Sequence, residues 1–123
     1  MQGLILVMTG GAVGSGARYL VGRAMAGALG PGWPWGTLTV NVVGGLAMGL
    51  LVGGLARWGG EPWRLLLGVG VLGGFTTFSA FSLDVVTLMQ RGAGASALAY
   101  IALSVVGAVA ALWIGLILTR VPA

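Results

Sequence analysis

The sequence predicts an all-α integral membrane protein with four transmembrane helices, the third of them broken near its middle. The uncharged runs are long: residues 1–17, 24–56, 65–83 and 92–119 contain no Asp, Glu, Lys or Arg. A helix that crosses the roughly 30 Å hydrocarbon core of a bilayer needs about 20 such residues. The mean hydropathy is +1.05, and the polar loops are too short for a soluble domain. We therefore expect residues 1–123 to form a single four-span domain in the lipid bilayer.

Short segments rich in Pro, Gly and Trp separate the expected spans. Pro and Gly pairs in such segments are turn signals. Trp33, Trp35, Trp58 and Trp63 lie in these segments, as expected for the aromatic belts at the two membrane interfaces. The separating segments are GPGWPWG (30–36), RWGGEPWR (57–64) and QRGAG (90–94). The spans expected between them are about 3–28, 35–56, 65–89 and 95–119.

The arginines are balanced between the two sides of the membrane. Four spans place both termini on one side, and each side then carries three arginines. Orientation normally follows an excess of Arg and Lys on the cytoplasmic side. Because the count is tied, we expect dual topology, in which copies insert both ways and can pair as an antiparallel homodimer; the alternative is one orientation set by another signal. The side of the termini carries Arg57, Arg64 and Arg120, and the opposite side carries Arg18, Arg23 and Arg91.

Titratable side chains are scarce. The chain has no His, Cys or Lys, and its two acids, Glu61 and Asp84, lie far apart in the sequence. General acid–base catalysis needs a titratable group near the reacting atom, and ordinary transition-metal sites need His or Cys. The net charge of +4 comes from scattered arginines, which are typical interfacial anchors. We expect neither an enzyme nor a nucleic-acid partner.

The single acid within a span argues against one class of small transporter. Proton-coupled exporters of cations need a carboxylate inside the membrane that exchanges protons against the substrate. The first span contains no acid, and Asp84 lies toward the far end of the third. A cation exporter is therefore disfavoured, whereas a path for a solute that needs no carboxylate is not.

The stretch GGFTTFSAFSLD, residues 73–84, interrupts the third span. Gly73 and Gly74 lower helix propensity, and the hydroxyl residues after them compete for backbone hydrogen bonds. We expect a break between Gly73 and Thr77, with Thr77 capping the restarted helix. Such backbone is tolerated in a membrane only where it is buried in protein or lines a watery cavity, and the freed carbonyls of Gly73 and Thr76 can then bind a cation. The alternative is a kinked helix whose hydroxyls bond back to the preceding turn.

Five further side chains are candidates for a polar path. Phe78 and Phe81 are three residues apart and share a helix face, and the positive edge of a phenyl ring can solvate a small anion. Asn41, mid-span, is either a clasp between helices or a ligand on a polar path. Arg18 either extends to the interface or faces a vestibule that concentrates anions. Ser104 is a lone hydroxyl in an apolar fourth span.

Glycines recur at four-residue spacing, as in Gly10 and Gly14 or Gly70 and Gly74. Small residues four apart share one helix face and let two backbones approach closely. We therefore expect tight helix packing, and association with partners, because four thin helices alone enclose little.

Three blocks resemble the signature blocks of the Fluc/CrcB family of fluoride channels: GGAVGSGARY (10–19), GTLTVNVVGG (36–45) and GGFTTFSAFSLD (73–84). The similarity covers all four spans in order. It implies passive export of fluoride across the plasma (inner) membrane by an antiparallel homodimer with two pores. It also implies a structural Na⁺ at the dimer centre, bound by main-chain carbonyls at the break.

The resemblance also implies roles for individual residues. The Na⁺ carbonyls would be those of Gly73 and Thr76, and Phe78, Phe81 and Asn41 would line the pore. Arg18 matches the vestibule arginine of the family. The remaining positions expected near the ion path are Ser79, Thr39 and Ser104.

Two residues depart from the family pattern. Ala80 replaces the usual Thr, which removes one hydroxyl and puts the conduction rate in question. Asp84 replaces the usual Glu. Two other readings remain: a dual-topology exporter of another substrate, and an accessory subunit of a larger membrane complex. The accessory subunit would lack a polar constellation in mid-span, and Asn41 together with residues 76–82 counts against it.

Overall fold

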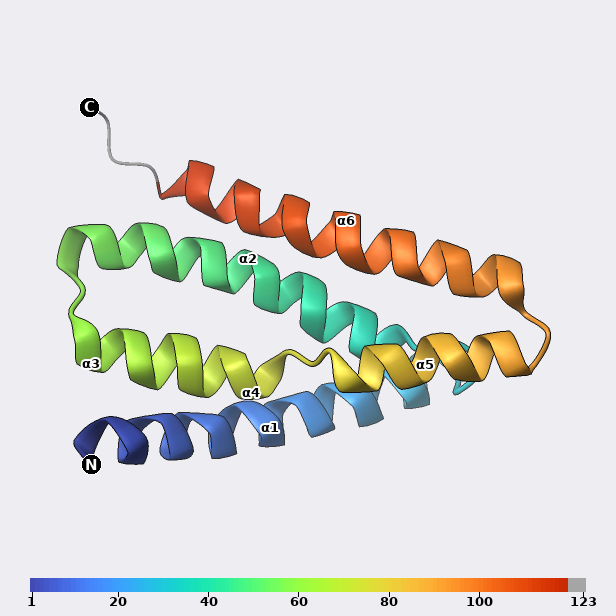
Figure 1. The fold of residues 1–123 in the computed structure, drawn as a ribbon, viewed down its shortest axis with the longest axis horizontal. Coiled ribbons are helices and arrows are strands. Elements are labelled where there is room, and N and C mark those ends of the chain that lie inside the picture. The colour runs from blue at the N-terminus through green and yellow to red at the C-terminus, as the bar shows by residue number, and fades with distance from the viewer. Residues whose placement is uncertain (120–123) are drawn as a thin grey trace.

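Four long helical segments form an elongated antiparallel bundle in the computed structural model, which describes residues 1–119 (Figure 1). All four are long and apolar enough to cross a membrane, which confirms the four predicted spans. The first, second and fourth segments are α1 (Gln2–Leu29), α2 (Trp35–Trp58) and α6 (Gly94–Leu118). The third is divided into α3 (Glu61–Trp63), the π-helix η1 (Arg64–Leu72), α4 (Gly73–Phe75) and α5 (Ser79–Gln90).

The connections between the segments lie at opposite ends of the bundle. The start of α1 and the end of α6 are at the same end as the α2–α3 connection, and the other two loops are at the far end (Figure 1). This arrangement places Arg57 and Arg64 at one end and Arg23 and Arg91 at the other. Arg120, counted in the charge balance, lies outside the described residues.

Helix α1 packs against η1 and α4 through glycines. A Cβ atom added to Gly10 would lie 2.8 Å from the backbone nitrogen of Val71 and 2.9 Å from the Cα of Gly70. A Cβ on Gly74 would lie 2.6 Å from the carbonyl oxygen of Gly11. No side chain fits in these spaces, so the two backbones are in direct contact, as the four-residue glycine spacing predicted.

Helices α2 and α6 form the second closely packed pair. A Cβ atom on Gly115 would lie 2.6 Å from the carbonyl oxygen of Leu46, and one on Gly49 would lie 3.0 Å from the Cα of Gly115. The bundle therefore consists of two glycine-mediated pairs, and the third segment passes from the α1 side toward α6, which α5 contacts.

The third segment is interrupted at residues 76–78, as Figure 1 shows between α4 and α5. Gly73 and Gly74 are helical, and the first extended residue is Thr76, with φ −88° and ψ 160°. The break therefore begins within the predicted range from Gly73 to Thr77, near its end, and Gly74 remains helical in α4, in contact with Gly11. The π-helix before it was not predicted; such wide turns often lie at functional sites.

The buried core lies where α5 and α6 meet. Leu88, Ala97 and Tyr100 are almost fully buried there, and Trp33 and Phe81 pack against them. This cluster fixes the start of α5, and hence one side of the break, relative to α6.

Candidate functional site

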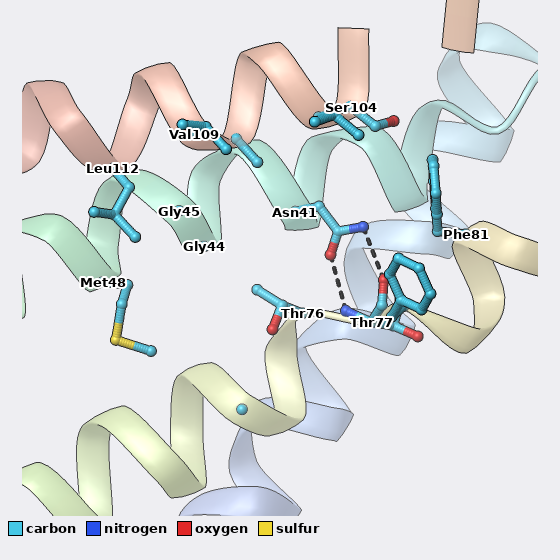
Figure 2. A pocket seen from close by; sticks show the side chains of 14 residues that line it. Asn41, Gly44, Gly45, Met48, Thr76, Thr77, Phe81, Ser104, Val109 and Leu112 are labelled. Atoms are coloured by element: carbon cyan, nitrogen blue, oxygen red, sulfur yellow. Dashed lines mark hydrogen bonds between the residues drawn. The ribbon is translucent and has the colours of Figure 1, made fainter. Parts of the chain in front are cut away.

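An open groove with a volume of about 580 Å³ lies between α2, α6 and the broken third segment. Its polar lining gathers at one end: Figure 2 shows Asn41, Thr77 and Ser104 there, next to the ring of Phe81. Met48 and Leu112 lie toward the other end, which is aliphatic. Phe78, Gly73 and Thr76 also line this groove. The fold thus gathers most of the residues that the sequence singled out.

Asn41 binds the interrupted backbone directly. Its Nδ2 donates to the carbonyl oxygen of Thr77 at 2.9 Å, and its Oδ1 accepts the N–H of Thr77 at 2.8 Å (Figure 2). The side-chain amide therefore pairs with Thr77 as a neighbouring strand would. Of the two sequence interpretations, the clasp is present, and it joins α2 to the break. The second Nδ2 hydrogen is free of this pairing, and Asn41 also lines the groove.

The hydroxyl groups around the break show both patterns considered from the sequence: bonds back to the preceding turn, and a cap for the restarted helix. Thr76 Oγ1 donates to the carbonyl of Leu72 at 2.9 Å, and Ser82 Oγ donates to that of Phe78 at 2.9 Å. These bonds are the back-bonding that a kinked helix predicted. At the same time, Thr77 Oγ1 accepts the N–H of Ala80 at 3.2 Å, so Thr77 caps the restarted helix as expected.

Two carbonyl groups lose their helical donors at the break. In an uninterrupted helix the N–H of Thr77 would bond to Gly73 and that of Ala80 to Thr76. The first is bound to Asn41 and the second to the Thr77 hydroxyl. Gly73 and Thr76 both line the groove. The sequence predicts that these two carbonyl oxygens can bind a cation. Cation binding at this position stays a prediction.

The two phenylalanines lie next to each other at the start of α5. The ring centroids of Phe78 and Phe81 are 5.6 Å apart, with the planes at 43°. Phe78 is 77% exposed, whereas Phe81 packs against Tyr100 with centroids 5.2 Å apart. Both rings line the groove, one open to the surroundings and the other fixed in the core.

Ser104 contributes a polar atom without a partner. The residue is 5% exposed, and its hydroxyl makes no hydrogen bond within residues 1–119. Buried polar atoms in folded proteins are nearly always paired, so this hydroxyl keeps an unused hydrogen-bonding group beside the groove that Ser104 lines. Figure 2 shows Ser104 on α6, across from Asn41 on α2.

Arg18 lies in a second pocket, of about 350 Å³. Its Nε donates to the carbonyl oxygen of Gly74 at 3.2 Å, so the guanidinium is turned inward to the third segment. Arg23 and Thr37 also line this pocket, and no acid does so among the described residues. Thr77 lines both pockets, so the Asn41–Thr77 pair lies between the basic pocket and the groove.

Three positions that the sequence singled out line neither pocket: Thr39, Ser79 and Ala80. Thr39 is half-buried on α2 but lines neither one, whereas Thr37, one turn before Asn41, lines the basic pocket. Ser79 is exposed at the start of α5, with its Oγ 3.5 Å from Thr77 Oγ1. Ala80 is likewise absent from the lining of both pockets.

Sequence reasoning missed Tyr100. Its side chain is completely buried, and its hydroxyl donates to Asp84 Oδ2 at 3.0 Å. A buried tyrosine hydroxyl usually finds a partner, and Asp84 is the only acid within the predicted spans. A tyrosine in one span and a single acid in another could therefore have been predicted to form a hydrogen bond. The bond also gives the Asp84 carboxylate a partner away from the groove, which it does not line.

Comparison with known proteins identifies the family. Residues 5–116 match the model of the family described as CrcB-like protein, Camphor Resistance (CrcB). A protein of Sphingopyxis alaskensis named fluoride-specific ion channel FluC is 58% identical over 122 residues, which cover 98% of this chain and 97% of the relative. Proteins with the same name from Phenylobacterium zucineum and Caulobacter vibrioides are 58% and 56% identical with the same coverage. The chain belongs to the CrcB family.

Proposed function

We propose that this protein is a fluoride-selective ion channel, which lets fluoride leave the cytoplasm passively across the plasma membrane. Relatives that are more than half identical over nearly the whole chain are named fluoride-specific ion channels. One arrangement carries most weight: Asn41, Ser104 and the two phenylalanines line the same groove. These groups are hydrogen-bond donors and ring edges, the chemistry that a small hydrated anion needs.

Fluoride must exchange water for protein contacts as it passes. The free Nδ2 hydrogen of Asn41 and the unpaired hydroxyl of Ser104 can replace water donors, and the positive edges of Phe78 and Phe81 can follow. Conduction requires contacts that are strong enough to admit an ion and weak enough to release it. Among the described residues that line the groove, none carries a charged side chain, so no side-chain charge holds fluoride there.

The same lining supports passive transport over coupled export. A proton-coupled exporter needs a titratable group in the substrate path. The acid of the third segment, Asp84, is bound to Tyr100 instead of lining the groove. An accessory subunit, the other alternative, gives no reason for a buried unpaired Ser104 beside Asn41. A selective path for an anion accounts for both observations.

The working unit that we propose is an antiparallel homodimer with dual topology. Phe78 is 77% exposed and lines a groove that is open on one side. Irregular backbone and polar groups are not tolerated against lipid, so a second copy is needed to cover the break. The tied arginine count lets copies insert in both orientations, which an antiparallel pair requires.

A Na⁺ ion at the centre of that dimer fits the carbonyls of the break. Gly73 and Thr76 line the groove, and the carbonyl oxygen of each lacks its helical donor. Hard cations prefer neutral and anionic oxygen ligands, and an antiparallel pair would supply these carbonyls twice. A bound cation would add a fixed positive charge near an anion path that holds no Lys.

Fluoride efflux from proteoliposomes tests the function. Purified protein is reconstituted with internal fluoride or chloride, valinomycin clamps the membrane potential, and ion-selective electrodes follow release. We expect rapid fluoride efflux with negligible chloride efflux. Absence of fluoride efflux from a folded, reconstituted protein would reject the proposal, and equal rates for both ions would reject selectivity.

A further inference from the structure

Five aromatic rings form a continuous row from the loop between α1 and α2 to the helix break. The centroid distances are 4.5 Å for Trp35–Trp33, 5.3 Å for Trp33–Tyr100, 5.2 Å for Tyr100–Phe81 and 5.6 Å for Phe81–Phe78. All fall in the range of about 4.5–7 Å at which aromatic pairs attract each other. The row therefore connects one end of the bundle to the groove.

Tyr100 is the fixed middle member of this row. Its side chain is completely buried in the cluster with Leu88 and Ala97, and its hydroxyl is held by Asp84. A ring enclosed in this way changes position only when a neighbour does, because protein interiors are close-packed. Phe81 packs against one side of the Tyr100 ring. The surface that supports Phe81 therefore moves only if Tyr100 moves.

Trp33 supports Tyr100 from the loop. Its ring meets that of Tyr100 edge-on, with the planes at 79°. The loop itself is anchored, since Arg91 Nη2 donates to the carbonyl oxygen of Gly32 at 2.8 Å, and the N–H of Trp35 donates to the carbonyl of Trp33 at 2.8 Å. The backbone around Trp33 is thus held by these two hydrogen bonds. The indole ring in turn restricts the position of the Tyr100 ring.

We propose that Trp33 is a positioning residue for Phe81, acting through Tyr100. The inference rests on the proposed fluoride path along Phe81. A phenyl ring attracts an anion with its edge and repels it with its face, so its orientation decides whether the path favours fluoride. Without the indole, Tyr100 gains space, the Phe81 ring rotates more freely, and part of the time it turns its face to the ion.

Ring mobility can be measured without any ion flux. The chain has three phenylalanines, so biosynthetic labelling with 3-fluorophenylalanine gives three ¹⁹F signals, assigned by single Phe→Leu replacements. We expect Trp33→Leu to shift or broaden the Phe81 signal and to leave that of Phe75 unchanged. Trp33→Met takes its place if Trp33→Leu does not fold. General loosening of the fold would move all three signals alike and would reject a positioning role.

Selectivity supplies the second readout. We expect Trp33→Leu to lower the ratio of fluoride to chloride efflux about tenfold, on the order of one lost aromatic contact, and Trp33→Phe to restore most of it. Trp113→Leu is the matched control, because Trp113 is 65% exposed on α6. An unchanged Phe81 signal and ratio in Trp33→Leu, or an equal loss in Trp113→Leu, would overturn the proposal. A wild-type protein without fluoride efflux would instead reject the proposed function, while the ¹⁹F signals still decide whether Trp33 positions Phe81.

Discussion

The side chain of Asn41 and the backbone of Thr77 form a closed pair of hydrogen bonds, 2.9 and 2.8 Å long, across 36 residues of sequence. This pair satisfies both backbone groups of the residue at the centre of the break. It also lies between the basic pocket of Arg18 and the groove of the phenylalanines. A single amide therefore stabilises the irregular backbone at the residue that lines both pockets.

Two substitutions of Asn41 test its role in stabilising the Thr77 backbone and its role in conduction. Asn41→Leu leaves the N–H and C=O of Thr77 without partners, which we expect to lower the free energy of unfolding by about 1–3 kcal/mol and to abolish fluoride efflux. Asn41→Asp keeps an acceptor for the Thr77 N–H but sets a carboxylate oxygen against the Thr77 carbonyl and adds a negative charge at the groove, so it should abolish efflux and also lower stability. Thermal unfolding in detergent and proteoliposome efflux measure both.

Thr39→Val is the matched control for Asn41, since Thr39 is half-buried on the same helix but lines neither pocket. We expect efflux close to that of the wild type. A large loss in this variant would restore Thr39 to the ion path, as the sequence predicted. Normal efflux in Asn41→Asp would remove the amide from that path.

Replacing either groove phenylalanine, the exposed Phe78 or the partly buried Phe81, should stop conduction without unfolding the protein. Phe78→Ile and Phe81→Ile each remove an aromatic ring edge while preserving an apolar side chain of similar volume. We expect fluoride efflux to fall sharply while the oligomer elutes unchanged from size-exclusion chromatography. Phe75→Ile is the control, because Phe75 lies in α4 and does not line the groove. Equal efflux in all three variants would contradict a role for the rings.

We expect Ser104→Ala to affect stability and fluoride efflux differently. Removing a buried hydroxyl that has no partner among the described residues should leave stability unchanged or raise it slightly. Fluoride efflux should nevertheless fall, because one donor is lost from the groove. Ser96→Ala, on the same helix but outside the groove, is the comparison. A stability loss of about 1 kcal/mol or more would indicate that Ser104 has a structural partner in the assembled protein.

Removing Na⁺ tests the cation proposed at the break. An ion that binds only the folded dimer stabilises it by mass action, by about 1.4 kcal/mol for each tenfold rise in concentration above its Kd. We expect the unfolding temperature of the purified dimer to fall when N-methylglucamine replaces Na⁺ at constant ionic strength, and to recover when Na⁺ returns. The same unfolding temperature in both buffers would count against a structural Na⁺.

The sequence by itself determined the elements of this fold, because they depend on local properties. The lengths of the uncharged runs define four spans, and Gly and Pro end them. The glycine spacing correctly indicated close backbone packing, which the structure places between α1 and the third segment, at Gly10 and Gly70. Phe78 and Phe81 are neighbours because they are three residues apart.

Only the tertiary structure decided which distant groups meet. The break begins at Thr76 because contact with α1 keeps Gly74 helical. Local propensity predicted only that it falls between Gly73 and Thr77. Asn41 pairs with Thr77, and Tyr100 with Asp84, because helix packing places them within hydrogen-bonding distance. Propensity acts within a few residues of the chain, whereas these contacts depend on the rotation and register of whole helices, which glycine-to-backbone packing fixes.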